Sequence, residues 1–202
     1  MVVRETEKVW GAYFQKMGKT YQEPVLQIYS GATRTGCGTG QASAGPFYCP
    51  ADNKLYIDLS FYNTMKNQLG AEGDAAFAYV IAHEVGHHVQ TMLGTLGKVH
   101  NLQQQVGKTE SNALSVKLEL QADCYAGVWG YYAQKDGLFE DGDIEEAYMA
   151  AEAVGDDTLQ QRAQGYTVPH TYTHGTSAER KKWLQRGLQT GDINQCNTFA
   201  AR

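Results

Sequence analysis

The sequence lacks several features that would place it in a large class of proteins. It has no run of about 18 apolar residues, so no segment of this chain is expected to span a membrane. The N-terminal segment 1–8 is polar and charged and does not predict a signal peptide. Basic runs are also missing, since the densest is Arg180-Lys181-Lys182, and the net charge is −5. These properties argue against a nucleic-acid partner.

The cysteines lack the C-x-x-C spacing that is typical of structural zinc sites. Cys37 and Cys49 flank a glycine-rich segment that resembles a hairpin, so we expect them to form a disulfide. Cys124 and Cys196 then remain as the second pair. Two disulfides would indicate an extracytoplasmic protein, periplasmic or in the cell envelope. The alternative is four reduced thiols in a cytoplasmic protein.

The chain has 202 residues, of which 42% are hydrophobic and 19% charged. This length and composition are typical of one globular domain. The spacing of apolar residues predicts α+β architecture, with a small antiparallel sheet early in the chain and packed helices after it. Asp74 and Ser177 are expected to cap helices, and segments 30–46 and 94–110 to be a loop and a connection or lid. The expected strands are 25–29, 47–49 and 54–59, and the expected helices are 4–18, 74–93, 111–134, 143–152 and one that starts at 177.

What the sequence does contain is an H-E-x-x-H motif, His83-Glu84-Val85-Gly86-His87, within the expected helix 74–93. The two histidines are four residues apart, so their imidazoles lie on one helix face and can share one Zn²⁺. Glu84 is the next residue round the helix, so it stays at the site but is badly placed to be a third ligand, and it is suited to take a proton from a water on the metal. The adjacent His88 lies about 140° from His83, so we expect it to pack or support the site.

A third protein ligand is needed for a catalytic zinc site. The extended motif that ends in a third histidine is missing, because Leu93 stands where that histidine would be. The remaining candidates are His100, His170, His174 and a glutamate on the helix 111–134. We favour Glu119, because Asp123 lies one turn further on the same face and could accept a hydrogen bond from a ligand histidine. The alternative for Glu119 is an ion pair on a solvated face.

Residues near the C-terminus could complete the site. His174 lies in a glycine-bearing loop just before a helix, where it could stabilise the oxyanion of an attacked carbonyl. His170 and Tyr172 are weaker candidates for that role. A peptide substrate is expected to add as a strand to an exposed sheet edge around the segment Tyr48 to Asp58, and Tyr48 and Tyr56 are the candidate substrate-binding residues there.

Several phrases of the sequence resemble the bacterial neutral zinc metallopeptidase family, of the gluzincin type. They are Gly45–Asp52, Tyr79–Gln90, E-L-Q-A-D at 119–123, Gly155–Gln160 and Thr173–Ser177. The resemblance implies a zincin-like fold, one zinc ion on His83, His87 and Glu119, and Glu84 as the base.

The segment from His174 to Arg180 is similar to an H-x-x-x-x-x-R element of membrane-associated gluzincins, in which both residues face the substrate. Members of the family often carry an N-terminal hydrophobic segment, so the resemblance also implies a possible membrane anchor in the native protein.

We therefore expect residues 1–202 to form a single zinc metallopeptidase domain that hydrolyses peptides or proteins. The alternative is a zinc-containing binding or scaffolding module, whose site is latent or is blocked by the segment 94–110.

Overall fold

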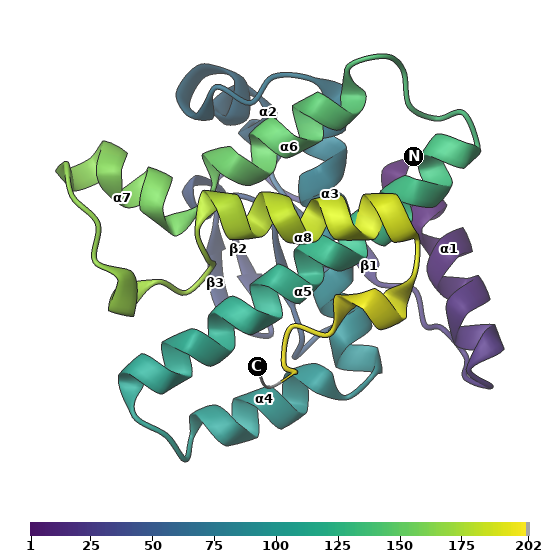
Figure 1. The fold of residues 1–202 in the computed structure, drawn as a ribbon, viewed down its shortest axis with the longest axis horizontal. Coiled ribbons are helices and arrows are strands. Elements are labelled where there is room, and N and C mark those ends of the chain that lie inside the picture. Colours follow the sequence, from purple (N-terminus) through teal and green to yellow (C-terminus); the bar gives the residue numbers. More distant parts are fainter. Residues whose placement is uncertain (201–202) are drawn as a thin grey trace.

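A computed structural model describes residues 1–200 of the chain. Figure 1 shows α8 lying across α5, with α3 and the strands behind them. The α+β architecture expected from the sequence is confirmed, because a small sheet precedes the packed helices. The strands are β1 (Val25–Ile28), β2 (Ala32–Thr35), β3 (Gly38–Gln41), β4 (Phe47–Cys49) and β5 (Lys54–Ile57). The helices are α1 (Val2–Lys16), α2 (Phe61–Thr64), α3 (Asp74–Met92), α4 (Thr95–Gln103), α5 (Lys108–Lys135), α6 (Asp143–Ala153), α7 (Asp156–Gln164) and α8 (Ser177–Thr190).

The main sheet differs from the expected antiparallel one. Its order is β1-β5-β4, and β5 pairs antiparallel with β4 but parallel with β1. The parallel pair forms because the chain returns to β5 after an excursion through the hairpin of β2 and β3. That hairpin lies in the segment 30–46, where the sequence predicted a loop. Its glycines weaken the alternation of apolar and polar residues by which strands are recognised.

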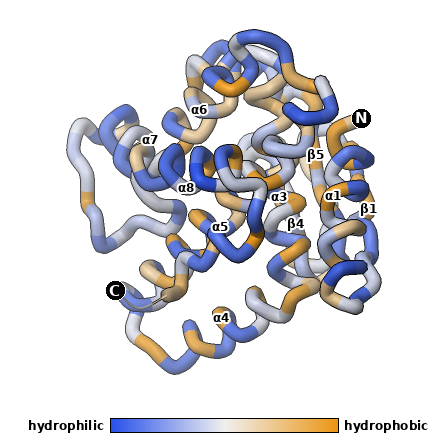
Figure 2. Tube along the Cα trace, turned by 45° about the vertical axis from the view of Figure 1, so that its right-hand side comes forward, coloured by the Kyte–Doolittle hydropathy of each residue, from blue (hydrophilic) through white to orange (hydrophobic). Residues whose placement is uncertain are grey.

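Helix α3 lies between the two larger apolar clusters of the core. One cluster joins α3 to α5 and α6, and the other joins it to α1, β5 and the C-terminal segment. Apolar segments accordingly gather around α3, whereas α7 and the outer turns of α8 are largely polar (Figure 2). None of the helices within residues 1–200 has both the length and the apolar content needed to cross a bilayer.

Glycines allow the three central helices to approach one another closely. A Cβ on Gly86 of α3 would lie 3.0 Å from the carbonyl oxygen of Ala122 on α5. A Cβ on Gly127 of α5 would lie 2.2 Å from the carbonyl oxygen of Leu184 on α8, and Gly187 faces Gly127 across the same contact. The backbones are therefore in direct contact, and this sets how far apart side chains on neighbouring helices lie.

Some helix boundaries differ from those expected. The segment 94–110 is mostly the helix α4, which packs on α5 through Leu96, Val99 and Leu118. Helix α7 was missed, because its sequence is largely polar. Thr176, not Ser177, is the residue before α8 and forms a capping box with Glu179. Asp74 is the first residue of α3 and does not act as its cap.

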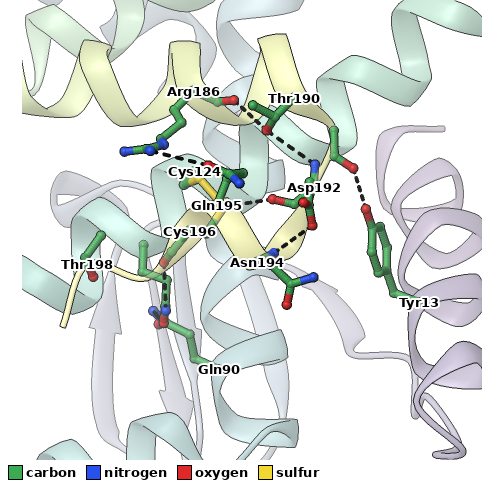
Figure 3. Close-up of a disulfide and its surroundings, with 12 residues drawn as sticks. Tyr13, Gln90, Cys124, Arg186, Thr190, Asp192, Asn194, Gln195, Cys196 and Thr198 are labelled. Atoms are coloured by element: carbon green, nitrogen blue, oxygen red, sulfur yellow. Dashed lines mark hydrogen bonds between the residues drawn. A yellow bond between two sulfur atoms is a disulfide. The ribbon is translucent and has the colours of Figure 1, made fainter. Parts of the chain in front are cut away.

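Two disulfides join the cysteine pairs expected from the sequence, Cys37–Cys49 and Cys124–Cys196. The second attaches α5 to the short helical turn Ile193–Cys196 (Figure 3). The Gln121 amide donates to the Cys196 carbonyl at 3.0 Å and accepts from the Gln90 amide at 2.9 Å. The C-terminal segment is therefore connected, through α5, to the helix that carries the H-E-x-x-H motif.

Candidate metal centre

Two histidines of α3 and one glutamate of α5 converge at a site where His83 is buried and the other two side chains are half-buried. Nε2 of His83 lies 2.9 Å from Glu119 Oε2, and Nε2 of His87 lies 3.1 Å from Glu119 Oε1. One ligand atom from each of the three residues lies within 4.8 Å of the others. Among residues 1–200 this is the one cluster of histidine, cysteine or acidic side chains with the geometry to hold a metal ion.

The close approach of α3 and α5 places the glutamate opposite the histidines. Gly86 lies between the two histidines in sequence, and it packs on Ala122, which lies between Glu119 and Asp123. A larger side chain at position 86 would push the helices apart and would separate Glu119 from both imidazoles. The glycine inside the motif therefore has a packing function that the histidine spacing alone does not reveal.

Both ligand imidazoles are oriented by hydrogen bonds from Nδ1, the ring nitrogen that does not face Glu119. Nδ1 of His83 donates to Asp123 Oδ1 at 2.8 Å, and Nδ1 of His87 donates to Gln90 Oε1 at 2.9 Å. These bonds leave Nε2 of each ring for a metal, as in most histidine ligands of zinc. Gln90 was not predicted from the sequence as part of the site, although its position three residues after His87 places it on the same helix face.

Arg180 takes a different position from the one that the resemblance implies. Its side chain is buried, with 4% of the residue exposed, and does not lie on an open surface that faces a substrate. Nε donates to Asp123 Oδ2 at 2.8 Å, and a terminal nitrogen lies 3.8 Å from Glu119 Oε2. Arg180 is therefore part of the support for the cluster. Its burial follows from the glycine contact between α5 and α8, which the sequence pattern of α8 did not indicate.

The electrostatics of the cluster favour a positive charge between the three side chains. Burial acts to lower the pKa of His83, but the carboxylates of Asp123 and Glu119 outweigh it and raise this pKa to about 10. Burial acts to raise the pKa of Glu119, but the His87 and His83 imidazoles hold it well below its usual range. A divalent cation would supply this positive charge, and two imidazole nitrogens with a carboxylate are typical zinc donors. The residues present therefore fit a zinc ion.

Glu84 lies beside the ligands and is attached to the sheet. The backbone N–H of Tyr48 on β4 donates to Glu84 Oε2 at 3.1 Å. Burial raises the pKa of Glu84, while the nearby His83 and His87 act in the opposite direction. A raised pKa suits a carboxylate that must both accept and release a proton.

The two tyrosines predicted to bind substrate occupy different positions. Tyr48 lies on the edge strand β4, next to Glu84. Tyr56 lies on the central strand β5, is 2% exposed and donates to Asp52. The expectation that Tyr56 lines an open edge is therefore wrong, because β1 covers that side of β5.

His88 has the supporting role expected for it. Its Nε2 donates to the backbone carbonyl of Gln22, and its Nδ1 lies 2.9 Å from the Tyr48 hydroxyl. Burial lowers the pKa of His88, which favours its neutral form.

The remaining histidines lie outside the cluster. His174 is in the loop before α8, where its Nδ1 lies 3.3 Å from Asp156 Oδ1 and its side chain is 51% exposed. His100 on α4 and His170 in the turn Pro169–Thr171 are both exposed, and neither belongs to the group that could hold a metal.

Comparison with known proteins agrees with this geometry. Residues 1–199 match the family described as "Putative neutral zinc metallopeptidase". The chain belongs to this family. It is 60% identical over 199 residues to the uncharacterized protein YpfJ of Escherichia coli K12, a match that covers 98% of this chain and 69% of the relative. It is 46% identical over 192 residues to the uncharacterized protein Rv2575 of Mycobacterium tuberculosis, with 90% of this chain and 64% of the relative covered.

The chain thus spans about two thirds of the length of these relatives. No solved structure matches it at a significant level.

Proposed function

We propose that this protein is a zinc-dependent peptidase, with one zinc ion per chain held by His83, His87 and Glu119. The observation that carries the proposal is the convergence of these three side chains beside the half-buried Glu84, whose carboxylate accepts the Tyr48 N–H. A purely structural zinc site has no need for a carboxylate in that position. Membership of the zinc metallopeptidase family supports the same reaction class.

A bound zinc ion would supply Lewis acidity, which polarises the scissile carbonyl and makes a water molecule more acidic. Glu84 would take a proton from the attacking water and pass it to the leaving amine. His174 would donate a hydrogen bond to the oxygen of the attacked carbonyl, where negative charge develops. Asp123 and Gln90 would hold the two ligand imidazoles in place throughout.

The substrate is proposed to be an extended peptide that adds to the free edge of β4. Within residues 1–200 this strand pairs only with β5, and the opposite edge carries the Tyr48 N–H that bonds to Glu84. A peptide laid along that edge would pass the base. Because the Tyr48 N–H is already bonded to Glu84, N–H groups of the peptide that donate to backbone carbonyls of β4 would hold it independently of its side chains.

We also propose that the protein acts outside the cytoplasm. Support comes from the two disulfides, which persist in oxidising compartments and are rare in the cytosol.

The test is to incubate the zinc-loaded protein with a diverse peptide mixture and to read the cut sites by mass spectrometry. The proposal predicts cleavage that a chelator abolishes and that added zinc restores. The variant Glu84→Gln should retain zinc and should lose at least about 10²-fold in rate, because it removes the base and keeps the shape of the side chain. Zinc binding without cleavage of any peptide would instead favour the zinc-containing binding module.

A further inference from the structure

The segment Gly155-Asp156-Asp157 has no part in the metal cluster, yet the Asp156 side chain accepts hydrogen bonds from the loop that carries His174. Asp156 is the first residue of α7 and is 8% exposed. One of its oxygens, Oδ2, accepts three consecutive backbone N–H groups, from Thr173 at 2.9 Å, His174 at 2.7 Å and Gly175 at 2.8 Å. The Asp156 N–H donates back to the Gly175 carbonyl at 2.9 Å.

The second oxygen of Asp156 faces the His174 ring. Oδ1 lies 3.3 Å from Nδ1, and the Thr173 hydroxyl lies 2.9 Å from the same nitrogen. Within residues 1–200, Nε2 of this half-exposed ring has no hydrogen-bond partner. The carboxylate therefore contacts the loop backbone with one oxygen and the imidazole with the other.

The neighbouring residues of the phrase support the start of α8 and do not contact His174. Asp157 Oδ1 accepts the Ser177 N–H at 2.8 Å. A Cβ on Gly155 would lie 2.3 Å from the Ser177 nitrogen, so only glycine fits there. Asp156 and Asp157 are adjacent in sequence and similar in chemistry, but only Asp156 reaches the imidazole.

We infer that Asp156 is a positioning residue for His174. Its carboxylate holds the loop 173–175 and accepts a hydrogen bond from Nδ1–H of the imidazole, so that Nε2 is left for the substrate. The consequence for catalysis rests on the proposed peptidase function. The hydrogen-bonded arrangement itself does not, and it can be measured separately.

A carboxylate at this position has two effects on the imidazole. It selects the neutral tautomer with the proton on Nδ1, and it stabilises the protonated ring. The pKa of His174 is raised, first by the hydrogen bond to Asp156 and further by the charge of Glu119, while burial and the charge of Arg180 act against the increase. Protonated His174 presents a charged Nε2–H, which donates to an oxyanion more strongly than the Nε2–H of a neutral imidazole does.

The decisive variant is Asp156→Asn. The three backbone N–H groups require an acceptor at the Oδ2 position, so the amide oxygen must take that place and the NH₂ group must face His174 Nδ1. An NH₂ group donates to Nδ1 and moves the neutral proton to Nε2. Asp157→Asn is the matched control, and Thr173→Val tests the hydroxyl that also lies near Nδ1.

The experiment is an NMR titration of ¹⁵N-histidine-labelled, zinc-loaded protein, with His174 assigned from the spectrum of His174→Gln. The wild type should show the Nδ1–H tautomer when neutral. Asp156→Asn should show the Nε2–H tautomer and a His174 pKa lower by about one unit. Asp157→Asn and Thr173→Val should change neither the tautomer nor the pKa by a comparable amount.

A wild-type spectrum with the Nε2–H tautomer would overturn the inference, even if no variant folded. A tautomer that changes in Thr173→Val and persists in Asp156→Asn would overturn it as well. With peptide substrates, Asp156→Asn should lower kcat on the order of ten- to a hundredfold with KM nearly unchanged. Absence of peptide cleavage in the wild type, together with the expected spectra, would reject the peptidase function and retain the role of Asp156.

Discussion

The junction of α3, α5 and α8 is held by helix backbones in direct contact, whereas the strands of the N-terminal half are held largely by hydrogen bonds and a disulfide. In the junction, Gly86 and Gly127 remove the side chains that would separate the helices. In the strand region, Cys37–Cys49 joins the β2–β3 hairpin to β4. Strand β1 is exposed along its whole length, and Ile28 is 54% exposed.

The two regions supply different parts of the candidate site. The junction brings together the three residues that could bind zinc and the buried pair of Asp123 and Arg180. The strand region contributes the Tyr48 N–H that holds Glu84. The candidate metal ligands therefore depend on the junction, whereas the carboxylate of Glu84, which also lies on α3, depends in addition on the strand region. A change in the strand region should leave zinc binding measurable.

The largest expected effect comes from removing the carboxylate that joins α5 to α3. Glu119→Ala should lower the zinc content from about one ion per chain to near zero, because only two histidine ligands would remain. Glu110→Ala, on an exposed turn of the same helix, is the control and should retain zinc. Elemental analysis after gel filtration measures both variants. Retention of zinc in Glu119→Ala would mean that a histidine is the third ligand.

The disulfides offer the next comparison, because one lies in each region. Replacing Cys124 and Cys196 by serine should lower the free energy of unfolding by about 4 kcal/mol, and replacing Cys37 and Cys49 by about 3 kcal/mol, since the first pair closes the longer loop. Denaturant titration measures both effects. Cys37 is exposed while Cys124 and Cys196 are fully buried, so a mild reductant should open Cys37–Cys49 first. Earlier loss of Cys124–Cys196 would contradict this account of the junction.

Adding a single methyl group should have opposite effects on stability in the packed junction and at an open position of α4. Gly127→Ala should lower the free energy of unfolding by about 1–3 kcal/mol, because its Cβ meets the backbone of α8. Gly97→Ala in α4 has no atom within 4 Å of the added Cβ and should raise stability by about 0.5–1 kcal/mol. Thermal unfolding of both variants distinguishes a steric effect from helix propensity. Equal shifts in the two would show that the α5–α8 contact is looser than described.

The smallest expected effect is on stability in acid, to which Asp58 in the strand region contributes. Hydrogen bonds from the Gly31 and Ser60 N–H groups lower the pKa of Asp58 from its usual 3.8. Because the pKa is lower in the folded state, this carboxylate stabilises the fold above about pH 4 and loses that contribution as the pH falls through the folded-state value. The difference in Tm between the wild type and Asp58→Asn should therefore be largest above about pH 4 and should shrink below it. A constant difference would show that ionisation of Asp58 contributes nothing.

Much of the site could be predicted because its signals are local. The i, i+4 spacing of His83 and His87 and the position of Glu84 depend only on helix geometry. Glu119 and Asp123 could be chosen as candidates because they lie one turn apart on another expected helix. The cysteine pairs followed from their number and from the short separation of Cys37 and Cys49.

Other features depended on neighbours that are distant in sequence. Arg180 belongs to a basic, mostly solvated helix, and only the contact of Gly187 with Gly127 brings it beside Asp123. Tyr56 was expected on an exposed sheet edge. Because β1 pairs with β5, Tyr56 lies instead on the central strand of the sheet. Helix α4 was predicted as a connection, although Leu96 and Val99 are buried against α5.

The sequence by itself therefore determined which residues could hold a metal and which could move a proton, because helical spacing places these groups on the same turns in any fold that forms the helix. Only the tertiary structure decided how they are held. The packing of Gly86 on Ala122 sets Glu119 against the two imidazoles, and Asp156 connects α7 to the loop of His174. These contacts join segments far apart in the chain, so no local pattern could specify them.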